Sequence, residues 1–170
     1  MAIRDILKVG HPMLAKKAEP VDVVDHEIRA LARDMVETLH AAPGIVLAAP
    51  QVDVGKRVIV VDLSVGERPE DLIVLVNPEI LSEEGEVVCE EGCLSVPDIQ
   101  EKVKRPARVR VRGTDLEARE KLYEAEDLLA RAFCHEIDHL NGKLFIDKLS
   151  PLKRSMVKKK LRQAAAAEKA

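Results

Sequence analysis

The sequence predicts an α+β fold, built as a single domain over residues 1–170. Apolar residues recur at three- and four-residue spacing in two separated stretches, about 25–41 and 127–140, as is typical of amphipathic helices. Between these stretches lie β-branched runs bounded by turn residues, which indicate strands. Because the strands are grouped between the helices and do not alternate with them, repeated βαβ units are not expected. No internal repeat or linker divides the chain.

The first helix is expected over about 25–41. Asp25 can accept hydrogen bonds as its N-cap, and the helix should end near Pro43 and Gly44, because both residue types interrupt helices. Its apolar face consists of Ile28, Leu31, Met35 and Leu39.

Strands are expected at 57–63 and 72–76, where valine, isoleucine and leucine predominate. The stretch 108–112 alternates arginine with valine, so one of its faces should be solvated and the other buried. A turn at 113–115 leads into 121–123, and these two stretches should form a hairpin.

The second long helix should begin at Asp127. Its expected buried residues are Leu129, Ala132, Phe133 and Leu140. A third helix is expected over about 151–167, where the alanine run 164–167 strongly favours helix.

Charge is distributed unevenly along the chain. Residues 151–170 contain seven basic side chains and one acidic side chain, a net charge of +6, and the whole chain has −3, so residues 1–150 carry −9. A basic tail on an acidic body predicts attraction to a polyanion, and the alternative is a solvated helix whose lysines keep it in solution. The basic residues of the tail are Lys153, Arg154, Lys158, Lys159, Lys160, Arg162 and Lys169.

Composition favours an intracellular protein. The N-terminal residues lack the long apolar segment of a signal peptide, and no stretch approaches the roughly 20 apolar residues that cross a bilayer. The three cysteines form no CxxC pair and are odd in number, so no disulfide framework is expected. We therefore expect a cytoplasmic protein with free thiols, no membrane segment and no direct role on DNA.

Residues 135–139 form an HExxH run inside the second helix. Positions i and i+4 share a helix face, with Cβ atoms about 5–6 Å apart, so His135 and His139 can bind one metal ion. Glu136 can flank that ion without binding it, and a metal hydrolase needs this combination: ligands for the ion and a base for water. The alternative interpretation is an exposed polar helix face.

Cys93 is a candidate third ligand. It follows Gly92, which lets the backbone approach another group closely, and precedes Pro97, which interrupts regular structure. Metal coordination lowers the pKa of a thiol, so such a cysteine can bind as a thiolate. The alternative is a small buried apolar residue, and this is what we expect of Cys89 and Cys134.

A third segment, 44–51, runs through small residues and ends at Gln51. Small residues allow a ligand backbone to pass closely, and the glutamine amide can donate two hydrogen bonds. Taken alone, this segment could equally be an ordinary loop.

The three segments together resemble the peptide deformylase family in order and spacing. The family motifs GxGLAAxQ, EGCLS and HExDH appear here as GIVLAAPQ at 44–51, EGCLS at 91–95 and HEIDH at 135–139. Further matches follow at 140–147 and 149–153. The resemblance covers nearly the whole chain, and EGCLS followed by HExDH is a highly specific combination.

Two positions depart from the family pattern. Val46 stands where the first motif has its second glycine, and Cys134 stands where a glutamine precedes the first histidine. A β-branched residue at Val46 is strained if φ is positive, whereas with negative φ it only narrows the substrate cleft. Cys134 is expected to point off the metal face of the helix and to pack.

The resemblance implies the role of each catalytic residue. Cys93, His135 and His139 hold a divalent metal, and Glu136 takes a proton from the water that the metal acidifies. The family's usual metal is Fe²⁺, and zinc, nickel or cobalt can stand in its place.

Two hydrogen-bond donors are implied for the formyl oxygen, namely the side-chain amide of Gln51 and the backbone N–H of Leu94. The peptide backbone should run along 44–46 and 91–93 like an added strand. The substrate contacts carried over from the family are Gly44, Ile45, Val46, Glu91, Gly92, Leu128, Arg131 and Ala132.

The resemblance also implies a fold in which a central metal-bearing helix, about 127–140, is wrapped by antiparallel and mixed sheets. The implied activity is removal of the N-formyl group from the initiator methionine of nascent chains, with release of formate. N-formylmethionyl peptides are then the substrates, and the basic C-terminal helix makes the ribosome a candidate partner.

Two other classes of function stay open on the residues. An HExxH metalloprotease would use the same helix, but its third ligand usually lies downstream, whereas Cys93 lies upstream. A peptide-binding module without activity is the other candidate, with Val46 as the feature that favours it and an intact Glu136 as the feature against it.

Overall fold

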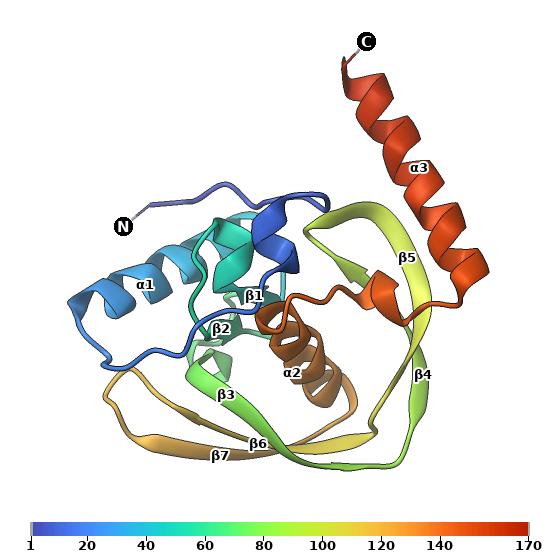
Figure 1. Ribbon diagram of the computed structural model, residues 1–170. Coiled ribbons are helices and arrows are strands. Elements are labelled where there is room, and N and C mark those ends of the chain that lie inside the picture. Colours follow the sequence, from blue (N-terminus) through green and yellow to red (C-terminus); the bar gives the residue numbers. More distant parts are fainter. Residues whose placement is uncertain (1, 170) are drawn as a thin grey trace.

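The computed structural model describes residues 2–169 and has the α+β architecture expected from the sequence. Figure 1 shows α2 in the centre with strands on several sides of it, α1 on one flank and α3 projecting from the body. The helices are α1 (His26–Ala41), α2 (Asp127–Leu140) and α3 (Pro151–Lys169). The strands are β1 (Val46–Ala48), β2 (Val58–Val61), β3 (Ile73–Glu84), β4 (Val87–Cys93), β5 (Val96–Arg105), β6 (Arg108–Thr114) and β7 (Glu120–Glu126).

The strands form two antiparallel sheets. Five strands pair in the order β1-β2-β3-β6-β7, and β4 pairs with β5. In the part of the chain that the structure describes, parallel pairing is limited to an isolated bridge between Glu19 and Lys56. Among the described residues β1 pairs with β2 alone, so it is an edge strand of the larger sheet.

The first helix forms where the sequence predicts it. The Asp25 side chain accepts a hydrogen bond from the Ile28 N–H at 3.0 Å and so caps the helix. Its predicted apolar face is buried and packs over β1 and β2. The 3₁₀ turn η2 (Ala49–Val52) follows β1 directly, its Ala49 and Val52 belong to the same core as α1, and its Gln51 is buried.

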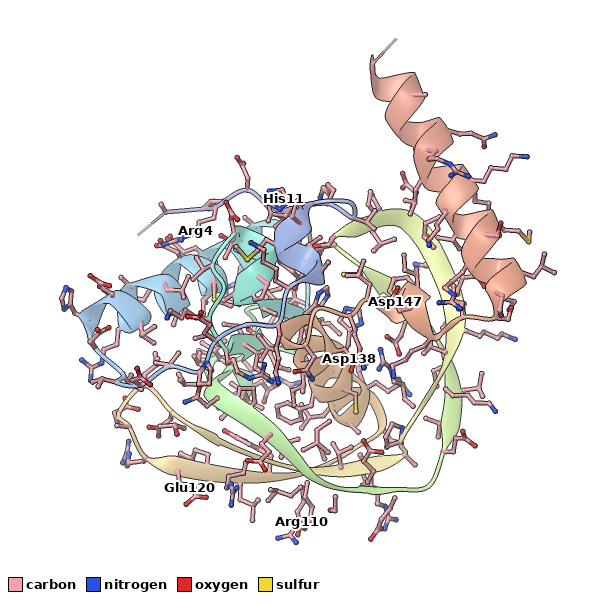
Figure 2. All side chains as sticks on the ribbon, in the orientation of Figure 1. Arg4, His11, Arg110, Glu120, Asp138 and Asp147 are labelled. Carbon is pink, nitrogen blue, oxygen red and sulfur yellow. The ribbon has the colours of Figure 1, made fainter. Side chains whose placement is uncertain are left out.

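The strands 57–63 and 72–76 are confirmed, but β3 continues to Glu84. Pro78 falls within a shift of the β3–β6 register between Val76 and Glu79, because a sheet tolerates proline at a bulge. The β6–β7 hairpin is also confirmed, and Figure 2 shows Arg110 and Glu120 on its outer face, away from α2.

β4 and β5 were not predicted from the sequence. Pro97 indicated an interruption of regular structure, yet it lies inside β5, and Gly92 lies inside β4. A Cβ added to Gly92 would lie 3.4 Å from Gln100 Cγ and 3.5 Å from the Ile99 carbonyl oxygen. Both are ordinary van der Waals distances, so the spacing of the two strands does not depend on glycine here.

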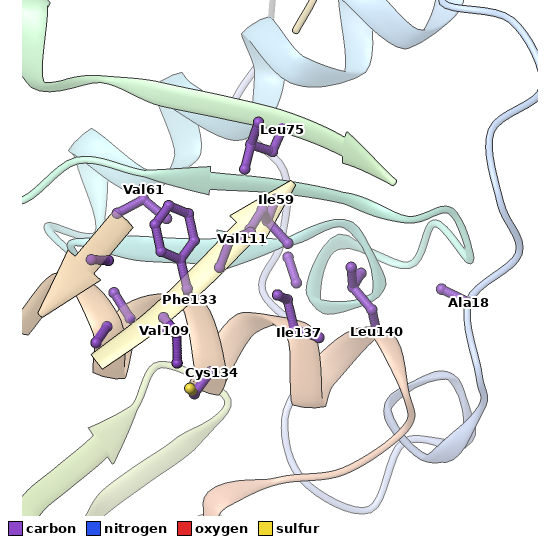
Figure 3. Packing of buried hydrophobic residues seen from close by; sticks show 14 residues of the cluster. Ala18, Ile59, Val61, Leu75, Val109, Val111, Phe133, Cys134, Ile137 and Leu140 are labelled. Atoms are coloured by element: carbon purple, nitrogen blue, oxygen red, sulfur yellow. The ribbon is translucent and has the colours of Figure 1, made fainter. Parts of the chain in front are cut away.

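Phe133 is at the centre of the main core. Its side chain is fully buried and points from α2 toward the strands that carry Val61 and Val111 (Figure 3). Cys134 is 4% exposed and belongs to the same cluster, as expected. One face of α2 is thus committed to the large sheet, which leaves another face for polar residues.

A separate core joins the small sheet to the C-terminal helix. Val96, Ile99 and Val103 of β5 pack with Phe145 and with Val157 of α3. None of the helices in the described chain combines the length and apolar character needed to cross a membrane.

Candidate metal centre

β4 and α2 lie side by side in matched register. Every second residue of β4 from Cys89 to Cys93 faces the helix, and each of them contacts a residue of α2 that lies four positions after the previous one. Cys89 Sγ accepts a hydrogen bond from Arg131 at 3.0 Å, Glu91 Oε1 lies 3.0 Å from His135 Nδ1, and Cys93 Sγ lies 3.3 Å from His139 Nε2. The match arises because two strand residues advance about 6.6 Å and four helical residues about 6 Å.

Cys93, His135 and His139 form a potential metal-binding group. They offer one ligand atom each, and these atoms lie within 4.8 Å of one another. Both histidines are buried, with ring centroids 4.9 Å apart. A thiolate and two imidazoles suit zinc and other divalent transition metals, and three protein ligands leave a coordination position open for catalysis.

Glu136 tests whether a metal fits here. Its side chain is fully buried, and neither carboxylate oxygen has a hydrogen-bond partner among the described residues. Burial raises the pKa of Glu136 to about 7. A buried carboxylate without a partner is costly, and water held by an ion at the neighbouring ligands would supply one. The donor set and the orphaned carboxylate therefore fit a divalent metal.

The two imidazoles differ in environment. Burial, together with the charge on His135, lowers the pKa of His139 to about 3, which keeps its ring neutral. Burial also lowers the pKa of His135, but hydrogen bonds with Cys93 and Glu91 outweigh it and raise the pKa to about 10. A metal at this site competes with that proton, so its binding should release protons.

A buried ion-pair network lies behind His135. Arg105, which is 3% exposed, lies 2.6 Å and 2.8 Å from the two Glu91 oxygens and 2.6 Å from Asp138 Oδ2. Burial raises the pKa of Glu91, but the bonds from Arg105 and His135 outweigh it and lower the pKa to about 2. An ionised Glu91 can accept the Nδ1–H of His135 and leave Nε2 free to bind a metal.

Gln51 reaches the site from η2. Its Oε1 accepts a hydrogen bond from the Ala48 N–H at 2.9 Å, while Nε2 donates to Ser95 Oγ at 3.0 Å and lies 3.7 Å from Cys93 Sγ. The Ser95 N–H also points at Cys93 Sγ, at 3.4 Å. Donors from two segments therefore point at the Cys93 sulfur.

The group opens into a cleft of about 640 Å³. Gly44 is closely packed, since a Cβ there would lie 2.9 Å from Leu94 Cδ1 and 3.0 Å from Leu39 Cδ1, and a larger residue would require these leucine side chains to move. The lining consists of Gly44, Ile45, Val46, Gln51, Gly92, Cys93, Leu94, Val96, Asp98, Ile99, Gln100, Glu101, His135, Glu136 and Lys160.

Four expected substrate contacts do not line this cleft. Glu91 faces Arg105 and His135, and the Arg131 guanidinium contacts Cys89. Ala132 is buried in the main core, and Leu128 is 42% exposed outside the lining. The expectation of a buried Cys89 is also wrong, since its thiol is half-buried against a charged group.

The sequence motifs did not reveal several contributors. Arg105 and Asp138 form the support of His135, and only the aspartate of HEIDH was signalled, by its place in the motif. The β5 residues of the lining were missed because β5 was not predicted as a strand. Lys160 had no local signal beyond its place in the basic tail.

An HExxH helix facing a cysteine-bearing strand, with a buried glutamate beside the ligands, defines the class of metal-dependent hydrolases. The family model described as polypeptide deformylase matches residues 3–155. The chain therefore belongs to the polypeptide deformylase family.

Similar proteins share nearly the full length of the chain. The peptide deformylase of Acidobacterium capsulatum is 50% identical over 163 residues, 96% of each chain. That of Thermodesulfovibrio yellowstonii is 51% identical, over 95% of this chain and 98% of its own. A crystal structure of a peptide deformylase from Legionella pneumophila superposes with a TM-score of 0.92 at 43% identity, covering 98% and 97% of the two chains.

Proposed function

We propose that this protein removes the N-formyl group from the methionine at the start of nascent polypeptides, releasing formate, and that the Cys93–His135–His139 centre carries out the reaction. Membership of the polypeptide deformylase family supports the activity. The observation that carries the assignment of the site is Glu136, a buried carboxylate without a hydrogen-bond partner among the described residues, beside three potential ligands.

In the proposed mechanism Cys93, His135 and His139 hold the metal, with Glu91 orienting His135 through Nδ1. A divalent ion there supplies Lewis acidity toward a carbonyl oxygen and lowers the pKa of water. Glu136 accepts the proton of the attacking water, since its pKa of about 7 suits proton exchange near neutrality. It then gives the proton to the departing amine nitrogen.

Gln51 and Leu94 are the proposed donors to the formyl oxygen as negative charge develops on it. Both line the cleft, and Gln51 Nε2 lies near the Cys93 thiol. Its bond to Ser95 Oγ fixes the amide in advance, so little reorganisation accompanies the reaction. Removing one such donor typically costs about 3–4 kcal/mol of transition-state stabilisation.

The substrate backbone is proposed to extend along β1. This strand is an edge of the larger sheet, and its residue Val46 lines the cleft next to Gly44 and Ile45. An unpaired strand edge offers N–H and C=O groups to an extended peptide, which binds as an added strand.

We propose Fe²⁺ as the native metal, with zinc, nickel or cobalt as functional replacements. The mixed thiolate and imidazole ligands accept all four ions. Elemental analysis of protein purified without oxygen tests the assignment, with about one iron per chain as the expected result. Stoichiometric zinc with full activity would overturn it.

A further proposal concerns partner and location. Arg154, Lys158 and Arg162 lie at four-residue spacing on α3 and line a shallow hollow with Pro151 and Ser155. A row of three cations suits a polyanion such as ribosomal RNA. We place the protein in the cytoplasm as one domain, with α3 toward the ribosome.

The decisive experiment compares formyl-Met-Ala-Ser with unformylated Met-Ala-Ser. The nickel-loaded protein should release formate and a free amine from the first peptide and leave the second intact. Cleavage between amino acids in either peptide would identify a protease, and binding without formate release would identify an inactive module.

A further inference from the structure

The C-terminal helix contributes one side chain to the cleft. Lys160 of α3 lines it together with residues of β1, β4, β5 and α2. It is exposed, and among the described residues of the lining it is the only lysine or arginine. A helix that is otherwise oriented outward therefore places a cation at the wall of the cleft.

The docking of α3 on the small sheet fixes this position. Val157 is 2% exposed and packs with Leu161 against the core of β5 and Phe145. One turn earlier, Lys153 Nζ lies 3.7 Å from Glu101 Oε2. Positions three and four apart share a helix face, so the face that docks also carries Lys160. Figure 1 shows α3 leaving the body beside the small sheet.

Charges around the cleft leave Lys160 available. It takes part in no ion pair among the described residues, while Glu101 is already paired with Lys153. Asp98 is the other exposed charge of the lining and has the opposite sign, so it limits the attraction of an anion. The remaining carboxylate, Glu136, is fully buried beside the metal ligands.

We propose that Lys160 is a specificity-determining residue that binds a carboxylate of the formylated peptide beyond its methionine. This inference rests on the proposed function. The carboxylate comes from an acidic side chain or from the terminal α-carboxylate of a short peptide, and the chemistry is the same. An exposed ion pair contributes modestly, so the effect should be about twofold to fivefold. The ion pair should change KM and leave kcat unchanged, because such a contact is made equally in the ground state and the transition state.

The test uses the full-length, nickel-loaded protein and C-terminally amidated formyl-Met peptides. One glutamate, or glutamine in its place, is moved through the second, third and fourth positions. At one of these positions the KM of the glutamate peptide should be about twofold to fivefold lower than the KM of the matching glutamine peptide. Lys160→Gln should make the KM values of the glutamate and glutamine peptides equal, and Lys160→Glu should make the KM of the glutamate peptide the higher of the two. About 0.5 M salt should shrink it, since salt screens exposed charges.

Lys159→Gln is the matched control, because this exposed lysine is adjacent in sequence but does not line the cleft. This variant should keep the wild-type ratio between the KM values of the glutamine and glutamate peptides. A second arm compares free-acid with amidated peptides lacking glutamate; a preference for the free acid that depends on Lys160 identifies the α-carboxylate as the group bound.

Equal ratios in wild type and Lys160→Gln in both arms would overturn the inference. All peptides would still release formate in that case, so the proposed function would stand. Absence of formate from every peptide would instead overturn the proposed function, and this inference with it.

Discussion

At the scale of single residues, burial separates Glu136 from the carboxylates around it. Glu91 and Asp138 both contact Arg105, whereas the oxygens of Glu136 have no hydrogen-bond partner among the described residues and only a looser contact, 3.6 Å from Oε1 to His135 Nε2. The same buried environment therefore holds one carboxylate ionised and raises the pKa of another to about 7. Because of this difference in pairing, we propose that Glu91 orients His135 and that Glu136 transfers protons.

Glu136→Gln should keep the metal and lose turnover by about 10²–10⁴-fold, because it removes a base and retains the shape of the side chain. Metal content by elemental analysis and kcat by formate release measure the two effects. Glu90→Gln, on the exposed face of β4, is the control and should behave as wild type. Loss of metal from Glu136→Gln would mean that this residue is a ligand.

Asp62 should account for part of the stability that the folded protein loses at acid pH. It is 1% exposed and accepts hydrogen bonds from Ser64 at 2.7 Å and from the Gly66 N–H at 3.0 Å, with His40 Nε2 at 2.7 Å. Burial raises its pKa, but these bonds outweigh it and lower the pKa below 3.8. Since the folded pKa is the lower one, the stabilisation is present above 3.8 and is lost as pH falls through the folded pKa.

Asp62→Asn should therefore lower the free energy of unfolding by about 2 kcal/mol at neutral pH, the scale of a hydrogen bond to a charged group. It should also flatten the loss of stability below about pH 4. Urea unfolding at several pH values measures both effects, with exposed Asp22→Asn as the control. An acid dependence as steep as that of wild type would contradict the assignment.

At the scale of elements, the sequence predicts those helices and strands whose apolar residues recur with a regular period, and it does not predict strands whose position depends on tertiary contacts. α1, α2 and the β6–β7 hairpin follow patterns that local burial imposes, and they form within a few residues of the predicted bounds. β4 and β5 lack such a pattern, since they wrap around α2 and contact it through polar residues. The three candidate ligands were predicted because they belong to motifs, whereas Arg105 and Lys160 reach the site only through the fold.

Val46 illustrates what backbone geometry adds. It lies in β1 opposite Val61 and is not among the residues with positive φ, so the strain considered from the sequence is absent. Its side chain packs partly on the main core while lining the cleft. The remaining interpretation is a cleft narrowed by one valine side chain.

Val46→Gly should change KM for formyl-Met peptides only modestly, by about twofold, because a half-buried side chain leaves part of the cleft already open. It should cost about 1–2 kcal/mol of stability through lost burial and the unfolded-state entropy of glycine. Kinetics and urea unfolding measure the two effects, and Val46→Ala separates side-chain loss from backbone freedom. A large rise in kcat would show that valine obstructs the reaction.

At the scale of the whole molecule, the candidate metal centre joins the two sheets. Cys93 comes from the small sheet, both histidines come from α2, which packs on the large sheet, and Gln51 follows its edge strand. An ion bound to these ligands cross-links parts that otherwise meet through side-chain packing. Its binding free energy should therefore appear as global stability.

Removal of the metal with a chelator should lower Tm by roughly 10 °C. This follows from about 4 kcal/mol for a ligand at a thousand times its Kd and about 2–4 °C per kcal/mol for a chain of this size. Calorimetry with and without chelator measures it. Cys89→Ser should keep the difference and Cys93→Ala should abolish most of it; an equal difference in both variants would exclude Cys93 as a ligand.

The matched register of β4 and α2 restricts where the length of this chain can change. One residue inserted between Cys89 and Cys93 would turn Cys93 to the opposite face of its strand. One residue inserted between Arg131 and His139 would rotate the second histidine by about 100° around the helix. Insertions and deletions should therefore be tolerated in the turns, such as the one between β6 and β7. Within the stretches 89–93 and 131–139 they should disrupt the site, although conservative substitutions there keep the register.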